Sequence, residues 1–220
     1  MSGKLSLREI KKARSKIAIF KAALDLIGET SFREVKVEDI CRKAEVSTVT
    51  FFKFFPQKED LLIYFMRLWL TDRLIELKEQ PKRGIGAIRH LFQTVAFGAS
   101  RKPGLMLSLI GYLAEVNMHP NMPVLSDAEI RILYPGKEEL VDAEAPELGE
   151  LFGRFIGEAK EDGDIPAHVP TEDLVKAMFT IFYGAYLTAH IYNSREFMEY
   201  YDLHLKLLIT KGENGPKQGP

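Results

Sequence analysis

The 220-residue chain contains a single cysteine, Cys41, so an internal disulfide cannot form. Low cysteine use is typical of a reducing compartment and predicts a cytoplasmic location. The N-terminal segment "MSGKLSLREIKKARSK" is basic, but no apolar segment of a signal peptide follows it. No stretch approaches the ~20 consecutive apolar residues of a membrane span. We therefore expect neither secretion nor a membrane partner.

Catalytic and cofactor motifs are also missing. The chain has no Gly-rich phosphate loop, no GxSxG elbow, no HExxH and no cysteine cluster. Its five histidines show no ligand-like spacing: His90, His119, His168, His190 and His204. Asp162, Asp164 and His168 are close in sequence but have the character of a polar loop. The sequence predicts a protein that is not an enzyme and that needs no cofactor or metal.

The charge is distributed unevenly, although the net charge is only −1. Residues 1–58 contain 13 Lys and Arg against 7 Asp and Glu, whereas the rest of the chain contains 17 against 24. The first quarter is therefore basic and the body acidic. This asymmetry indicates either a solvated basic tail or a surface that docks on a polyanion.

Apolar residues recur at steps of three and four along most of the chain, which predicts an all-α fold without strands or repeats. Breaks rich in Pro, Gly or Asn separate the helices. The expected helices are Lys11–Ile27, Val35–Ala44, Thr48–Phe54, Lys58–Lys78, Ile85–Ala99, Gly104–Asn117, Pro146–Asp162, Thr171–Tyr192 and Arg195–Thr210. Residues 1–8 are expected to be a flexible arm. The stretch 118–145 is the least regular, with a short helix at Asp127–Leu133.

The segment "VSTVTFFKFFPQKEDLL", residues 46–62, completes a helix-turn-helix pattern. Ser47 is a good N-cap for the third short helix, and Pro56 ends that helix. Three short helices with a tight turn between the second and third form the arrangement that places the third helix in a DNA major groove.

The residues from about Arg14 to Met66 resemble the DNA-binding domain of the tetracycline-repressor (TetR) family of transcriptional regulators. The resemblance is carried by "IFKAALDLI" and "VKVEDICRKAEVSTVTFFKFFPQKEDLL". It implies a helix-turn-helix domain with a basic arm at residues 1–57 and a helical regulatory and dimerisation domain at 58–210. About nine helices are expected in all, and residues 211–220 are expected to be a disordered tail.

The resemblance assigns the phenylalanines of "FFKFFP" to two roles. Phe51 and Phe55 match core positions and should pack on Leu24, Ile40 and Val46. Phe52 and Phe54 lie elsewhere on the helix, facing either DNA or the arm and fourth helix. The residues expected to contact DNA are Lys36, Ser47, Thr48, Val49, Thr50, Phe52, Lys53, Phe54 and Lys58. The basic side chains of Lys4, Arg8, Lys11, Lys12 and Arg14 either extend this surface or remain solvated.

Three positions depart from the usual pattern of the family. Glu45 stands where the turn usually has Gly, and a non-Gly residue in a left-handed turn costs about 1 kcal/mol. Lys36 stands where a Thr often caps the second helix, and Gln57 replaces the usual Ser or Asn cap of the fourth. None of these changes removes positive charge.

The family also implies an effector pocket in the helical body and a homodimer made by the last two helices. The candidate pocket residues are Met106, Leu109, Tyr112, Leu113, Phe152, Phe155, Phe179, Tyr183 and His190. Ordinary core packing is the alternative for each of them. The wide apolar stripe of the last helix indicates a self-association surface. The candidate interface residues are Phe197, Tyr200, Leu203, His204 and Leu207.

The sequence therefore predicts a ligand-responsive transcriptional regulator, with repression as the expected output. It should bind a palindromic operator in double-stranded DNA as a homodimer and leave it when a small, largely apolar effector binds. Two alternatives are an all-helical protein-interaction module and a helical enzyme, neither of which binds DNA. The enzyme alternative lacks any catalytic motif, and the interaction module leaves the basic first quarter and the small side chains of the third helix unexplained.

Overall fold

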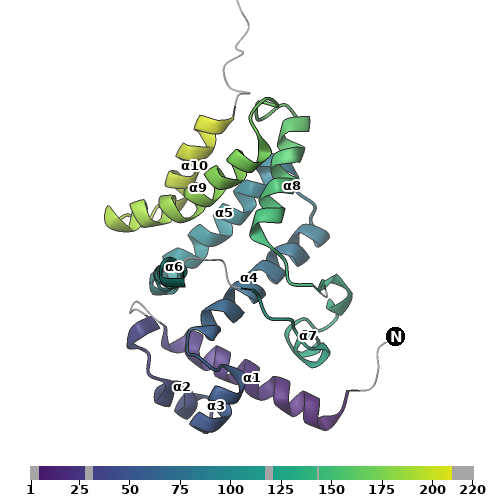
Figure 1. The fold of residues 1–220 in the computed structure, drawn as a ribbon, viewed down its shortest axis with the longest axis vertical. Coiled ribbons are helices and arrows are strands. Elements are labelled where there is room, and N and C mark those ends of the chain that lie inside the picture. Colours follow the sequence, from purple (N-terminus) through teal and green to yellow (C-terminus); the bar gives the residue numbers. More distant parts are fainter. Residues whose placement is uncertain (1–4, 28–31, 117–120, 143, 210–220) are drawn as a thin grey trace, which may run out of the picture. The chain divides into compact units, whose positions relative to one another are not determined.

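The computed structural model describes residues 5–27, 32–116, 121–142 and 144–209, and within these ranges the fold is all-α (Figure 1). The α-helices are α1 (Leu7–Leu26), α2 (Val37–Lys43), α3 (Thr48–Phe54), α4 (Asp60–Glu79), α5 (Gly84–Arg101), α6 (Pro103–Val116), α7 (Asp127–Leu133), α8 (Leu148–Glu161), α9 (Thr171–Ile191) and α10 (Phe197–Leu208). Two short 3-10 turns are η1 (Phe32–Glu34) and η2 (Glu138–Leu140). The predicted fold class is confirmed, with ten α-helices in the described ranges instead of about nine.

The chain divides into two compact units that interleave along the sequence. Unit 1 contains Met1–Glu79 and Lys102–Pro146, and unit 2 contains Gln80–Arg101 and Glu147–Pro220. Helices α4, α6 and α7 thus belong to the same unit as the helix-turn-helix. The boundary between these two units does not coincide with the predicted boundary between residues 57 and 58, since both residues lie in unit 1. The predicted functional boundary therefore stays a prediction. The predicted tail lies outside the described residues.

Unit 1 is built on one hydrophobic cluster that joins the helix-turn-helix to α4 and α6. Phe51 is completely buried, and Leu61 of α4 and Leu109 of α6 belong to the same cluster. Figure 1 shows α2 and α3 packed against α1, and α7 also contacts α1. Burying a side chain of this size stabilises a fold by about 1.5–3 kcal/mol, so the DNA-binding helices depend on elements far along the chain.

Helix α1 begins earlier than the sequence analysis expected. The Ser6 side chain accepts a hydrogen bond from the Glu9 backbone N–H, and the Glu9 carboxylate accepts one from the Ser6 N–H at 2.8 Å. This reciprocal capping box fixes the first turn at Leu7. Leu7 and Arg8 are therefore helical, and the prediction of a flexible arm is wrong for them. Residues 1–4 lie outside the described ranges.

Unit 2 is a four-helix arrangement with an aromatic centre. Helix α9 packs on α8 and α10, and α5 packs on the same two helices. Phe92 of α5 stacks on Tyr201 of α10, with ring centroids 4.6 Å apart. The Tyr201 hydroxyl donates a hydrogen bond to the Phe182 carbonyl of α9 at 2.8 Å. The buried rings and this hydrogen bond hold the last two helices together.

Helix α9 is long and apolar enough to cross a membrane by length and composition. A single helix of this kind is weak support for a span, because the core helix of a water-soluble protein meets the same criteria. Leu174, Phe182 and Tyr186 of α9 are buried, and the helix packs on α8 and α10. Its apolar character is thus accounted for in part by packing within unit 2.

Candidate nucleic-acid interface

The turn that leads into α3 is left-handed at Glu45, where φ is 54°. The Val46 N–H donates to the Cys41 carbonyl at 3.0 Å, and the Glu45 N–H donates to the Arg42 carbonyl at 3.3 Å. These two bonds form a Schellman motif, which usually places Gly at this position. The turn therefore has the geometry typical of a helix C-terminus despite the missing Gly, and the fold tolerates the strain.

Ser47 caps α3 as the sequence predicted. Its hydroxyl accepts a hydrogen bond from the Thr50 backbone N–H at 3.2 Å and shares another with the Thr50 hydroxyl at 3.0 Å. The helix then runs from Thr48 to Phe54, the span predicted from sequence. The cap fixes the direction in which the first turn of α3 points.

The inward face of α3 is also as predicted. Phe51 and Phe55 are both buried and belong to one cluster with Ile40, while Leu24 and Val46 pack against that cluster. The ring centroids of Phe51 and Phe55 are 5.9 Å apart. These two rings fix α3 on the core of unit 1 and leave its opposite face uncovered.

The uncovered face carries small side chains, one aromatic ring and one cation. Thr48 and Lys53 are exposed, and Val49 is 79% exposed. Phe52 is 49% exposed, with its ring edge-on to Phe51 at a centroid distance of 5.2 Å. Hydroxyl and methyl groups of this kind suit hydrogen bonds and apolar contacts with base edges, and a lysine suits a phosphate.

Phe54 and Lys58 lie differently from the other proposed DNA contacts. Phe54 is half-buried and packs against the core cluster, which favours the packing alternative. The Lys58 Nζ donates hydrogen bonds to the carbonyls of Phe32, Arg33 and Val35 at 3.0, 3.2 and 3.1 Å. Since an ammonium group has three donors, Lys58 has none left for a phosphate. The structure gives Lys58 a structural role and removes it from the proposed phosphate contacts.

Five other cations that the sequence analysis singled out are exposed at the surface: Lys36, Arg8, Lys11, Lys12 and Arg14. Lys36 is the N-cap residue of α2 and is exposed, and its side chain makes no capping hydrogen bond. Arg8, Lys11, Lys12 and Arg14 are exposed along the first half of α1. Gln57 does not cap α4 with its side chain; instead its backbone N–H donates to the Asp60 carboxylate at 2.8 Å.

The predicted effector residues fall into two groups, one in each unit. Met106, Leu109, Tyr112 and Leu113 lie on α6 in unit 1 and pack against the core of the helix-turn-helix. The α6 hydroxyl of Ser108 also accepts a hydrogen bond from the Phe32 N–H at 3.0 Å. This half of the predicted pocket therefore contacts η1 and belongs to the same hydrophobic cluster as the helix-turn-helix.

The second group of predicted effector residues belongs to the aromatic centre of unit 2. Phe152 and Phe155 are completely buried, and Phe152 meets Phe179 edge-to-face at 5.4 Å. Burial raises the pKa of the Tyr183 hydroxyl to about 12, which keeps it neutral. His190 is exposed, so core packing, the alternative given for it above, is wrong, and it does not belong to the buried aromatic centre.

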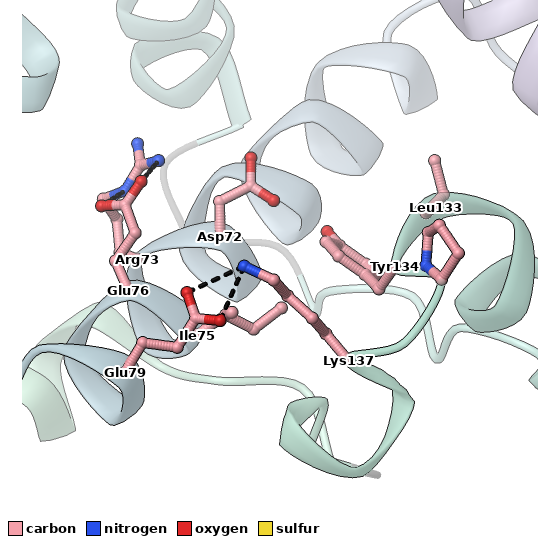
Figure 2. A pocket seen from close by; sticks show the side chains of 9 residues that line it. Asp72, Arg73, Ile75, Glu76, Glu79, Leu133, Tyr134 and Lys137 are labelled. Atoms are coloured by element: carbon pink, nitrogen blue, oxygen red, sulfur yellow. Dashed lines mark hydrogen bonds and ion pairs between the residues drawn. The ribbon is translucent and has the colours of Figure 1, made fainter.

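A surface groove of about 340 Å³ lies between α4 and the segment after α7 (Figure 2). Its lining residues are Asp72, Arg73, Ile75, Glu76, Glu79, Leu133, Tyr134, Pro135 and Lys137. Its two cations are already paired, Arg73 with Glu76 and Lys137 with Glu79. No predicted effector residue lines it. No motif in the sequence indicates this groove, because its walls come from segments some 60 positions apart.

The predicted dimer residues split between the interior and the surface of unit 2. Phe197 is buried against Tyr186, with stacked rings 5.1 Å apart, so it is a core residue and not an interface residue. Leu203 and Leu207 are 57% and 78% exposed. Tyr200 and His204 are half-buried, and the spacing of these four residues places them on one helix face. That face of α10 is apolar and uncovered.

These features define a class: an all-helical regulator fold with an N-terminal helix-turn-helix. Residues 19–65 match the family model described as bacterial regulatory proteins, tetR family. The predicted resemblance is confirmed, and the chain carries a TetR-family N-terminal domain. A search of curated proteins by sequence found no significant match.

Solved structures of TetR-family regulators share the fold over most of the chain. FadR from Thermus thermophilus, a TetR-family repressor solved with lauroyl-CoA, is 24% identical with a TM-score of 0.60, covering 93% of this chain and 100% of that one. FadR from Bacillus subtilis, solved with stearoyl-CoA, is 15% identical with a TM-score of 0.58, covering 88% and 97%. Escherichia coli NemR is 17% identical with a TM-score of 0.57, covering 89% and 97%. At these identities the likeness establishes the fold.

Proposed function

We propose that the protein is a DNA-binding transcriptional repressor that inserts α3 into the major groove of its operator. The observation that carries this proposal is the uncovered face of α3, where Thr48, Val49, Phe52 and Lys53 stand clear of a firmly packed inner face. Ser47 and Thr50 belong to the same first turn and complete the proposed contact set. Lys36 and the exposed cations of α1 would lie along the phosphates. A regulator of this kind works in the cytoplasm.

Fluorescence anisotropy with genomic fragments tests the proposal directly. One fragment should bind far more tightly than the rest, and its affinity should fall steeply with salt, since each neutralised phosphate releases counterions. A protein-interaction module or an enzyme would show neither the selectivity nor the slope. Binding that is absent or insensitive to salt would refute the DNA-binding role.

The uncovered faces of α9 and α10 in unit 2 support a proposed homodimer. On α10 the face contains Leu203 and Leu207, and on α9 the exposed end contains Ile191. Gly184 of α9 has open space around the position of a side chain, so that face of α9 can approach another helix closely. Pairing these faces by a twofold axis would form an intermolecular four-helix bundle. The operator should then be palindromic, with half-sites separated by roughly 10 base pairs or a multiple of it.

The proposed effector is a small, largely apolar molecule that binds beside α6. The packing of Met106, Tyr112 and Leu113 on the helix-turn-helix core supports this, because a ligand that displaces α6 must disturb that core. The two FadR structures contain acyl-CoA, a ligand with an apolar acyl chain on a charged CoA group. A long-chain acyl thioester is therefore the first compound to test, and its acyl chain is the part expected to bind beside α6.

Thermal shift followed by operator titration tests this effector class. Lauroyl-CoA should raise the melting temperature, whereas CoA without the acyl chain should not. If the coupling has the usual size, lauroyl-CoA should weaken operator binding by about 5- to 150-fold. A ligand that stabilises the protein but leaves operator affinity unchanged is not an effector.

A further inference from the structure

One buried carboxylate, Glu129 of α7, joins three helices of unit 1. It is 5% exposed. Its Oε1 accepts a hydrogen bond from the Tyr64 hydroxyl of α4 at 2.8 Å and pairs with the Lys16 Nζ of α1 at 2.7 Å. Its Oε2 accepts hydrogen bonds from the Ser126 N–H at 3.1 Å and the Ser126 hydroxyl at 2.7 Å. Both carboxylate oxygens are therefore fully engaged.

The partners of Glu129 are themselves held in place. The Lys16 Nζ lies 4.4 Å from the centre of the Tyr64 ring, so Lys16 contacts both the carboxylate and the ring. The Lys16 side chain is only 17% exposed. Burial opposes ionisation of Glu129, but Lys16 and Ser126 outweigh it and lower the pKa of the carboxyl. Glu129, Lys16 and Tyr64 thus form one polar network beside the apolar core of unit 1.

Tyr64 links this network to the proposed DNA-reading helix. Its ring meets Phe20 of α1 edge-on at 5.0 Å and Phe55, which ends α3, at 5.7 Å. Phe55 in turn contacts Phe51, and Phe51 contacts Phe52 on the exposed face. A continuous series of ring contacts thus runs from the hydroxyl that Glu129 holds to the exposed surface of α3.

A buried ion pair is a poor source of net stability, because desolvation offsets the Coulomb attraction. Apolar side chains of similar size would serve at least as well for stability alone. Hydrogen bonds differ from apolar contacts in fixing direction as well as distance. The arrangement around Glu129 is thus suited to orienting Tyr64 and α1.

We propose that Glu129 is a positioning residue that sets the orientation of α3 through Tyr64 and Lys16. Helix α7 contacts α1 directly (Figure 1), so Glu129 connects a helix outside the helix-turn-helix to the reading surface. This inference rests on the proposed function, in which α3 is the helix that reads DNA.

Two variants remove single parts of the network while keeping its shape. Tyr64→Phe deletes the hydroxyl and keeps the ring contacts, and Glu129→Gln deletes the charge that holds Lys16. The matched control is Glu79→Gln. It breaks the pair between Glu79 of α4 and Lys137 after α7, which bridges the same two parts of the chain but lies at the surface.

Hydrogen exchange followed by mass spectrometry measures positioning without any DNA. Amides of residues 48–55 should exchange faster in Tyr64→Phe and Glu129→Gln than in the wild type or in Glu79→Gln. Amides of α8 in unit 2 should be unchanged. Equal exchange at residues 48–55 in all four proteins would overturn the proposal. So would faster exchange in α8 to the same degree, since that would reveal a general loss of stability.

Operator binding provides the second measurement. Both network variants should weaken specific operator binding by roughly 2- to 30-fold, the usual range for residues that couple sites without touching the ligand. Affinity for non-specific DNA should be unchanged, because the phosphate-contacting cations remain. Unchanged operator affinity in both variants would overturn the proposal. If the wild type itself binds no operator, the proposed function fails, and the exchange experiment still decides whether Glu129 positions α3.

Discussion

Glu45 has a positive φ where a residue without a side chain would be relaxed. A left-handed conformation costs a non-Gly residue about 1–2 kcal/mol. Gly also increases the conformational entropy of the unfolded chain, which lowers stability by about 0.4–1 kcal/mol. We therefore expect Glu45→Gly to raise the free energy of unfolding by up to about 1 kcal/mol, measured by urea denaturation. Glu45→Ala retains the Cβ and should show no gain. A loss of stability in Glu45→Gly would mean that the Glu45 side chain is itself stabilising.

Lys53 and Lys58 are five residues apart but should respond differently to removal. Lys53→Ala should weaken binding to all DNA sequences alike and lower the salt slope by about one unit, leaving stability unchanged. Lys58→Ala removes one donor from each of three carbonyls and should cost about 1–3 kcal/mol of stability. Anisotropy at several salt concentrations and thermal denaturation separate the two effects. A stable Lys58→Ala protein with a lower salt slope would return Lys58 to the DNA contacts.

The N-terminus of α3 can be tested as a unit through its cap. Ser47→Ala removes the hydrogen bond to the Thr50 N–H and should cost about 0.5–2 kcal/mol of stability. Ser47→Asp keeps a capping oxygen and should retain stability, but its negative charge should repel phosphates. For Ser47→Asp, thermal denaturation should therefore give an unchanged melting temperature, while operator titration should give a lower affinity. If Ser47→Asp binds the operator normally, the first turn of α3 does not face DNA.

Elements with local signals in the sequence were predicted well. The span of α3 follows from Ser47 and Pro56, and α7 was located correctly in an otherwise irregular stretch that contains the Ser126 and Glu129 capping box. The same capping-box pattern at Ser6 and Glu9 starts α1 at Leu7, earlier than the apolar periodicity alone predicts. A contact between distant segments that matches no motif cannot be predicted in this way: the three carbonyls that accept hydrogen bonds from Lys58 lie more than 20 residues away from it.

The apolar helices of unit 2 show a second limit of sequence reasoning. When nearly every position of a helix is apolar, periodicity cannot distinguish the face that packs within the chain from the face that is left for a partner. Phe197 was therefore assigned to the interface although it is buried, and His190 was assigned to the interior although it is exposed. The assignment of Leu203 and Leu207 to a dimer interface stays a prediction, and their exposure is compatible with it.

At the scale of the whole molecule, the expected assembly is a dimer through α9 and α10. The double variant Leu203→Glu and Leu207→Glu places two like charges at the proposed interface, so it should be monomeric at micromolar concentration by light scattering. Phe97→Glu is the control, since Phe97 of α5 is also 60% exposed but lies outside the proposed interface. A double variant that remains dimeric would place the interface elsewhere. A monomeric wild type would remove the dimer from the proposal.

The interleaving of the two units limits how the protein can be re-engineered. A chimaera that transplants residues 1–57 alone would leave behind Leu61 of α4 and Leu109 of α6, which complete the core of the helix-turn-helix. Its α1 would also lose the α7 surface that covers it. A DNA-binding part that can be transplanted must instead combine residues 5–79 with 102–146, joined by a linker in place of α5. New operator specificities are therefore better obtained by substituting the exposed residues of α3 within the intact chain than by exchanging N-terminal domains.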